Sequence, residues 1–231
     1  MEFFENKFFL LAITFGFFFL SKLLQKKTGW VLLNPILVAI AMLICFLQFT
    51  GVSYETYSEA GSLVEFWLKP AVVALGVPLY LQLRMIKKQL MPILISQLAG
   101  CVVGLVSVTI IAKLMGASPE VIMSLAPKSV TTPIAMEVSN AVGGIPSLTA
   151  AVVIVVGLFG AICGFKLLQV GRVASPIAQG LSMGTASHAV GTSRAMEVSG
   201  KYGAYASLGL TLNGILTALL SPTILHILGL Y

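Results

Sequence analysis

Long apolar segments recur along the whole chain and are separated by short polar or charged segments. Each is close to the length of about 20 residues that lets a helix, rising about 1.5 Å per residue, cross a hydrocarbon core of roughly 30 Å. We expect about six full spans, at residues 8–24, 32–50, 63–83, 91–115, 147–168 and 204–228. The pattern predicts an all-α polytopic membrane protein.

The composition agrees with this prediction. Hydrophobic residues make up 58% of the 231 residues and charged residues only 10%, whereas soluble domains carry about 25% charged residues. We therefore expect a multi-pass protein of the cell membrane with the lipid bilayer as its solvent. The net charge is +6, but the cations cluster in short loops, as at Lys22, Lys26, Lys27, Arg84, Lys87 and Lys88. Such clusters are typical of cytoplasmic loops, so no nucleic-acid partner is expected.

Two segments, 119–142 and 176–201, fit a simple count of spans poorly. If 119–142 and 147–168 both crossed the membrane, Lys166 and Arg172 would face outward, against the tendency of such cations to stay inside. If 119–142 instead enters to mid-membrane and returns, both cations lie inside. Arms of about 10 residues rise about 15 Å as helix, half of the core. We predict two re-entrant hairpins, with two broken helices that cross the membrane as the alternative.

A five-residue sequence occurs twice. Ala-Met-Glu-Val-Ser at 135–139 recurs unchanged at 195–199, an offset of 195 − 135 = 60 residues. Thr132 and Thr192 match at the same offset. Chance identity over five consecutive residues is improbable, so the sequence indicates an internal duplication.

The duplication suggests how the chain is organised. We expect an N-terminal part, residues 1–115, that supplies a scaffold and part of the core, followed by a transport core at 116–231. Its repeat units, 116–172 and 173–231, each hold one hairpin and one full span. An odd number of crossings places the second copy upside down, so the two hairpins are expected to form an inverted repeat.

The hairpin tips, 127–133 and 187–194, are then expected to meet near the membrane midplane from opposite faces. Thr132 precedes Pro133 as a helix N-cap precedes a proline in the first turn, and Thr192 holds the equivalent position. A helix that starts at mid-membrane presents free N–H groups and a partial positive charge. The tips therefore have the chemistry of an anion-binding site.

Cations near both tips strengthen this interpretation. Lys128 and Arg194 are unfavourable at this depth unless they face a cavity or find partners, and a carboxylate substrate is such a partner. The alternative is permanent pairing with Glu137 and Glu197. The candidate substrate-binding residues are Lys128, Ser129, Thr131, Thr132, His188, Thr192, Ser193 and Arg194.

A coupled proton has candidate carriers in the same segments. Glu137 and Glu197 lie about one turn beyond the caps, and His188 aligns with Lys128 in the repeat. An imidazole with an ordinary pKa of about 6.5 titrates close to working pH, so these groups can carry a proton. Alternatively, the two glutamates only stabilise the helix starts.

Other residues add less. Asn34 and Lys69, each followed by proline, are additional candidates near the site, although Lys69 can equally extend to the headgroups. The three cysteines show no paired spacing, so neither a disulfide nor a metal site is expected. No nucleotide-binding loop or nucleophile with its base is present in the sequence, so we expect no enzyme activity and no cofactor.

The sequence resembles the LrgB/CidB family, which also includes YohK-type inner-membrane proteins and the membrane domain of the plant plastid glycolate/glycerate transporter. The resemblance covers nearly the whole chain. It rests on Leu-Asn-Pro at 33–35, Lys-Pro-Ala-Val-Val-Ala-Leu at 69–75, Ala-Ser-Pro-Glu at 117–120, Pro-Lys-Ser-Val-Thr-Thr-Pro-Ile-Ala-Met at 127–136 and Gly-Thr-Ala-Ser-His-Ala-Val-Gly-Thr at 184–192.

This resemblance implies two competing functions. One is secondary transport of small monocarboxylates such as glycolate, glycerate or pyruvate. The other is a holin/antiholin-like role in regulating murein hydrolase activity and autolysis, with a small LrgA/CidA-type membrane partner. A homo-oligomer, a dimer, is expected in either case. A lesion-forming protein needs oligomerising helices but no cation-bearing hairpins at the midplane, so the residues favour transport.

Overall fold

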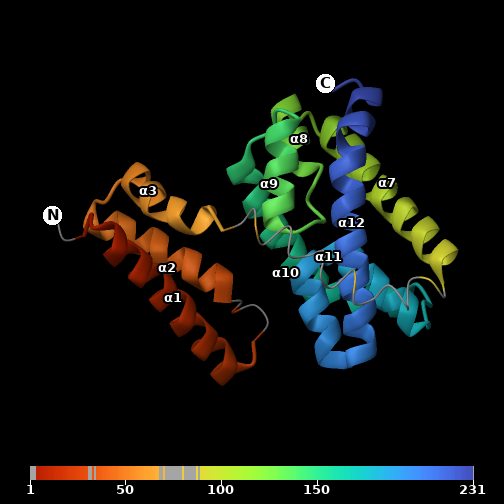
Figure 1. Cartoon of the computed structure of the whole chain (residues 1–231), viewed down its shortest axis with the longest axis horizontal. Helices are drawn as coiled ribbons and strands as arrows, with labels where there is room; N and C mark the ends of the chain where they lie inside the picture. The colour runs from red at the N-terminus through yellow and green to blue at the C-terminus, as the bar shows by residue number, and fades with distance from the viewer. Residues whose placement is uncertain are drawn as a thin grey trace. The chain divides into compact units, whose positions relative to one another are not determined.

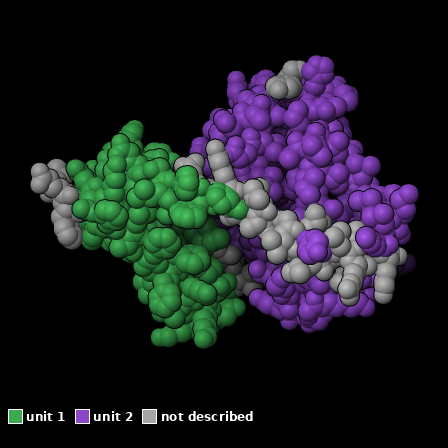
Figure 2. All heavy atoms as spheres, in the orientation of Figure 1, with its two compact units in different colours: residues 1–71 green, residues 72–231 purple. Residues whose placement is uncertain are grey.

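The computed structural model describes residues 4–30, 33, 35–67, 70, 80, 87 and 89–230, and of residue 65 only the backbone. The chain divides into two compact units, residues 1–71 and 72–231, shown in green and purple in Figure 2. All regular secondary structure in the described part is helical.

In the first unit, α1 (Lys7–Thr28) packs against α2 (Pro35–Thr50) and α3 (Tyr54–Glu65). The side-chain oxygen of Asn6 caps α1 by accepting hydrogen bonds from the first free N–H groups of the helix. The small core of this unit is formed by Leu10, Val52 and Ala60.

Four of the described helices are long and apolar enough to cross a membrane: α1, α7 (Leu90–Leu114), α10 (Pro146–Val170) and α12 (Gly200–Ile227). They coincide with the predicted spans 8–24, 91–115, 147–168 and 204–228, and the shorter apolar α2 coincides with 32–50. The predicted span 63–83 lies mostly outside the described residues. The chain is thus an all-helical, multi-pass membrane protein.

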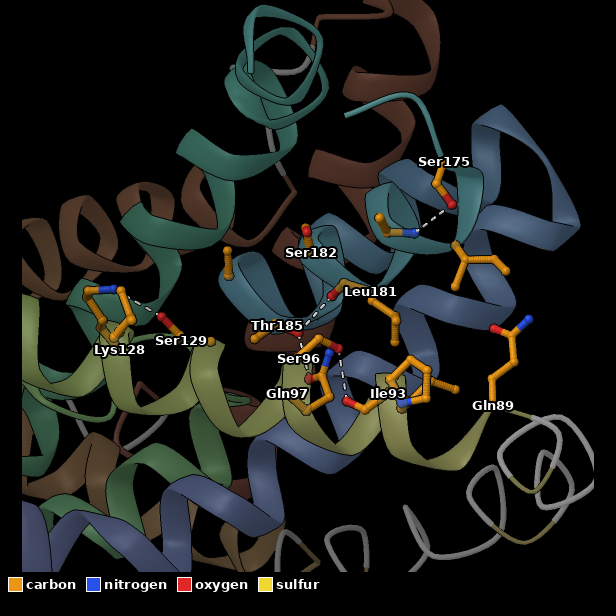
Figure 3. A pocket seen from close by; sticks show the side chains of 17 residues that line it. Gln89, Ile93, Ser96, Gln97, Lys128, Ser129, Ser175, Leu181, Ser182 and Thr185 are labelled. Carbon is orange, nitrogen blue, oxygen red and sulfur yellow. Dashed lines mark hydrogen bonds between the residues drawn. The ribbon is translucent and has the colours of Figure 1, made fainter. Parts of the chain in front are cut away.

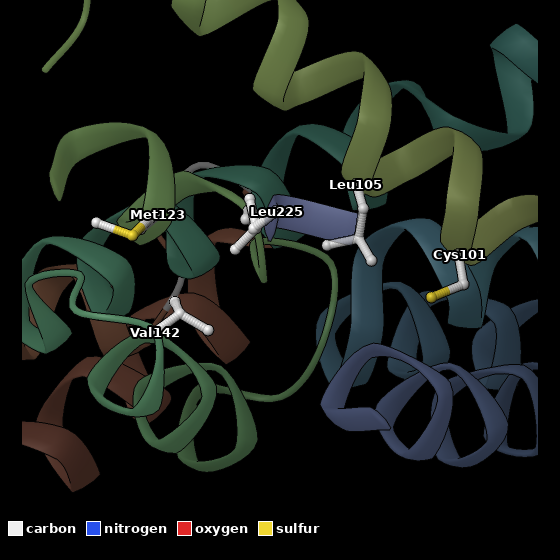
Figure 4. Close-up of a cluster of buried hydrophobic side chains, with 6 residues drawn as sticks. Cys101, Leu105, Met123, Val142 and Leu225 are labelled. Carbon is white, nitrogen blue, oxygen red and sulfur yellow. The ribbon is translucent and has the colours of Figure 1, made fainter. Parts of the chain in front are cut away.

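In the second unit, α7 and α12 run side by side in the same direction (Figure 1). Near their starts Ile93 packs against Tyr205 and Leu208. At their ends Lys113 Nζ donates a hydrogen bond of 3.3 Å to the backbone oxygen of Leu228. Between these points, side chains from both helices and from the segment 119–142 form a buried cluster, shown in Figure 4, of Cys101, Leu105, Met123, Ala126, Val142 and Leu225.

The helix α11 (Pro176–Val198) is interrupted in its middle. Ser187 (φ −130°, ψ 16°) and His188 (φ 41°, ψ −135°) have non-helical backbone angles. The second arm folds back on the first, because a Cβ added to Gly191 would lie 2.6 Å from the backbone oxygen of Met183. Eight residues of straight helix would separate these positions by about 12 Å. The segment is therefore a hairpin with its tip at residues 187–188.

The helices α8 (Pro119–Leu125) and α9 (Thr132–Ala141) form another hairpin, joined by a non-helical connection at 126–131. Ser124 Oγ accepts a hydrogen bond of 2.7 Å from the N–H of Ile145, just beyond the end of α9. The chain that leaves the second arm therefore lies beside the last turn of the first arm. Both segments predicted as hairpins are interrupted and folded back, while their relation as an inverted repeat remains a prediction.

Candidate functional site

A cavity of about 560 Å³ lies between α7, the first arm of α11 and the connection 126–131 (Figure 3). Its wall is mostly apolar, and a few polar side chains from all three elements project into it. These include Ser96 and Gln97 of α7, Ser182 and Thr185 of α11, and Lys128 and Ser129 of the connection. A mostly apolar cavity with a few convergent polar groups is the usual form of a small-molecule site.

Lys128 is the cation among the described residues of this cavity. Its side chain is half-buried, and Nζ donates a hydrogen bond of 3.0 Å to Ser129 Oγ (Figure 3). The two ion pairs found among the described residues join Lys7 to Glu59 and Arg194 to Glu197. In the described part of the chain, Lys128 therefore has no carboxylate partner. A half-buried ammonium without a counter-ion attracts an anion from outside the protein.

Polar residues of two long helices hold the hairpins at this site. Thr185 Oγ1 lies 2.7 Å from Gln97 Oε1 of α7. Asn213 of α12 is only 1% exposed, and its Nδ2 donates to the backbone oxygens of Thr185 at 3.0 Å and Ser129 at 3.4 Å. Asn213 thus ties the connection 126–131 to the first arm of α11.

Three residues of the site were not predicted from the sequence: Gln97, Thr185 and Asn213. The sequence did contain a signal for the two amides, because each lies inside an apolar span. A polar group without a partner is unfavourable in a lipid-embedded helix, so such an amide is expected to face the protein interior. Gln97 lies in α7 and Asn213 in α12, and both are almost fully buried.

The predicted helix caps are displaced. Thr131, with φ −61° and ψ 146°, is the N-cap of α9, and Thr132 is its first residue. The Thr131 hydroxyl is buried and has no hydrogen-bond partner among the described residues. Thr192 lies inside the second arm of α11, where Oγ1 donates a 2.8 Å bond to the backbone oxygen of His188. A threonine within a helix bonds in this way to the preceding turn, so Thr192 is not a cap.

His188 is at the tip of its hairpin, as expected, but it faces α10 and does not line the cavity. The residue is 4% exposed, and Nε2 lies 2.8 Å from the backbone oxygen of Val153. The ring packs so closely on α10 that a Cβ added to Gly157 would lie 2.6 Å from His188 Cε1. The imidazole is therefore packed against α10 and hydrogen-bonded to its backbone.

The remaining candidates are not brought to Lys128. Ser193 and Arg194 are exposed on the second arm of α11, and Arg194 Nη1 lies 2.6 Å from Glu197 Oε2. This is one of the two pairings that the sequence left open as an alternative. Glu137 is exposed on α9 and has no ion pair in the described part of the chain. Asn34 and Lys69 lie outside the described residues.

The model of the LrgB-like family matches residues 14–227. The chain belongs to the LrgB-like family. Among LrgB-like relatives, Holin-like protein CidB of Staphylococcus epidermidis is 38% identical over 216 residues, which is 94% of each chain. Holin-like protein CidB of Staphylococcus aureus is 36% identical over 216 residues, which is again 94% of each chain. Protein YwbG of Bacillus subtilis is 36% identical over 205 residues, 89% of this chain and 91% of the relative. No solved structure matches.

These findings confirm the family resemblance and identify the chain as a membrane protein of a family with holin-like members. The relatives' names favour the holin-like interpretation over carboxylate transport. The LrgB-like motifs at 127–136 and 184–192 contain Lys128, Ser129 and Thr185, which line the cavity. They also contain Thr131 and His188 at the two tips.

Proposed function

We propose that this LrgB-like protein is a secondary transporter that binds a small monocarboxylate at Lys128 and moves it across the membrane. The observation that carries the proposal is the half-buried Lys128 amine, without a carboxylate partner in the described residues, at a cavity of about 560 Å³. An ammonium removed from water is unfavourable unless an opposite charge compensates it. A bound carboxylate would supply that charge.

The residues that line the cavity favour a small acid with a single negative charge as the substrate. Lys128 is the one cation among the described residues of the wall, so it balances one carboxylate. Ser129 is hydrogen-bonded to Lys128, and Thr185 and Gln97 line the same cavity, so polar groups are available to bond a hydroxyl or keto oxygen. The apolar remainder would disfavour a second charge. We therefore propose a hydroxy- or keto-acid of two or three carbons, such as glycolate, glycerate or pyruvate.

The fold supports transport through the arrangement of its two hairpins. Ser175, at the start of the α11 hairpin, lines the same cavity as Gln89, at the start of α7. The α8 hairpin instead begins directly after the end of α7. We infer that the hairpins enter the bilayer from opposite faces as an inverted repeat, an arrangement that many secondary transporters use.

Uptake into proteoliposomes tests the proposal. The purified protein is reconstituted, and uptake of labelled glycolate, glycerate and pyruvate is measured with and without a pH gradient. We expect Lys128→Ala to lower uptake at least about tenfold, because one lost charge-assisted contact is worth about 1.5–3 kcal/mol. Lys128→Arg, which keeps the charge, is the matched control. Full uptake by Lys128→Ala would rule out this site.

A holin-like regulator of murein hydrolase activity and autolysis is the second candidate, and the names of the staphylococcal relatives favour it. An LrgA/CidA-type partner belongs to this proposal, whereas a homodimer is proposed for either function. Liposomes loaded with an uncharged dye separate the two functions. A transporter retains the dye while it takes up the acid, whereas a lesion-forming protein releases the dye whether or not residue 128 is a lysine.

A further inference from the structure

A second cavity, of about 460 Å³, lies on the other side of Lys128. Its wall comes from the later turns of α7, from the segment that follows α7, and from the end of α8. The lining residues include Ser107, Ile111, Met115, Gly116, Leu125 and Lys128. Lys128 is the single residue shared by the described walls of the two cavities.

The two cavities follow α7 from one end to the other. The first cavity is lined by α7 residues from the start of the helix to Gly104, and the second by residues from Ser107 to Met115 at its end. A helix of 25 residues is about 37 Å long, which is enough to cross the hydrocarbon core. The cavities therefore reach opposite ends of one membrane-crossing helix.

We propose that the two cavities are vestibules open to opposite faces of the membrane, with Lys128 as the partition between them. In this arrangement the amine attracts an anion from either vestibule and opposes the passage of cations. This inference deepens the proposed function, because it gives the bound acid its route, and it rests on that function only for the identity of the anion.

The connection that carries Lys128 is suited to such a role. Residues 126–131 form no helix. Their backbone bonds among the described residues are short-range ones: from Ala126 N–H to Ile122, Lys128 N–H to Leu125, Val130 N–H to Pro127 and Ala135 N–H to Thr131. Asn213 holds this connection through a bond of 3.4 Å to Ser129, which is long for an N–H···O bond. A short displacement of the connection would transfer the amine from one vestibule to the other.

Cysteine labelling tests the vestibules without any substrate. Cys45 and Cys163 are replaced by Ala, and Cys101 by Ser, which keeps a polar contact with Thr217. In this background, one variant carries Ser182→Cys in the first cavity and a separate variant carries Ser107→Cys in the second. A membrane-impermeant thiol reagent is applied to each side of oriented vesicles. Phe159→Cys is the control, because this exposed apolar residue of α10 lines neither cavity.

We expect the two cysteines to be labelled from opposite sides, each at least about tenfold faster than from the other side, and the control from neither. With an anionic reagent, Lys128→Ala should slow the labelling of both cysteines several-fold and Lys128→Arg should not, because the amine attracts anions from both vestibules. Labelling of both cysteines from one side would overturn the vestibules, and an unchanged rate at either cysteine in Lys128→Ala would overturn Lys128 as the group that the two vestibules share. If labelling is as expected but no acid is taken up, the proposed substrate fails and the route remains.

Discussion

At the tip of the α8 hairpin, Lys128 lines two cavities, and among the described residues its amine donates a hydrogen bond to the hydroxyl of Ser129. At the corresponding position of the duplication, 188 − 128 = 60 residues later, His188 is 4% exposed and bonded to the backbone of α10. The two positions correspond in the predicted duplication but differ in what they face. One presents an uncompensated charge, and the other fastens its hairpin to a neighbouring helix.

The difference follows from how each hairpin turns. The α8 hairpin turns through the non-helical connection 126–131, which has room to extend a long side chain sideways. The α11 hairpin turns within residues 187–188, and its two arms are pressed together so closely that Gly191 touches the backbone of Met183. A tight tip leaves its side chain no free volume, so we infer that this hairpin supplies the wall and the α8 hairpin the charge.

Introducing a charge at the tip of the α11 hairpin is expected to have the largest effect. His188→Lys places an ammonium where the side chain is almost fully enclosed and faces α10. A buried charge without a partner lowers the free energy of unfolding by about 3–5 kcal/mol, so we expect this variant to unfold at a much lower temperature in detergent. His188→Asn, which keeps an N–H donor toward Val153, is the control. Equal unfolding temperatures for His188→Lys and the wild type would show that the second tip also faces a cavity.

The second-largest effect is expected on α10, which receives the tight tip. A Cβ added to Gly160 would overlap the Oγ and Cβ atoms of Ser187. Gly160→Ala should lower the free energy of unfolding by about 1–3 kcal/mol, as overpacking does, and its unfolding temperature should fall. Gly104→Ala is the matched control, because a Cβ there meets nothing within 4 Å. If both variants were equally stable, the close contact of α10 with the α11 tip would be disproved.

The positions of the helices were predictable from the sequence because each span has to be apolar over the thickness of the bilayer. The spans 91–115, 147–168 and 204–228 agree with α7, α10 and α12 within a few residues. Pro133 and the repeat also located the interruptions in 119–142 and 176–201. Apolar length and proline position are local properties, and local properties are visible in a single sequence.

The direction of each side chain was not predictable. Arg194 and Lys128 are both cations near a tip, yet Arg194 is one helical turn from Glu197, and that local pairing turns it away from the cavity. His188 was expected at the site because it aligns with Lys128, but α10 offers it a backbone acceptor. The Arg194–Glu197 pair is local, and the sequence had left it open as an alternative. The contact of His188 depends on which helix lies across the interface, and the sequence of one segment does not contain that information.

A smaller effect is expected at Asn213, which connects the two hairpins. Asn213→Leu removes the bonds to the backbone oxygens of Ser129 and Thr185. Because a typical hydrogen bond contributes about 1 kcal/mol, the free energy of unfolding should fall by about 1–2 kcal/mol. The freed connection should also expose Ser129→Cys to thiol reagents several-fold faster. Thr217→Val, on the same helix but with its hydroxyl in contact with Cys101 of α7, is the control. An unchanged labelling rate would show that Asn213 does not hold the connection 126–131 in place.

The smallest effect is expected at the ion pair on the second arm of α11. Arg194 and Glu197 compensate each other at 2.6 Å, and neither lines a cavity. Replacing both by alanine removes one positive and one negative charge, so no unpaired charge remains and the field at Lys128 changes little. Acid uptake by the double variant should stay within about twofold of the wild type, whereas Arg194→Ala alone leaves Glu197 unpaired and should be less stable. Loss of uptake in the double variant, with normal insertion, would return Arg194 to the binding site and make the two hairpins equivalent in function.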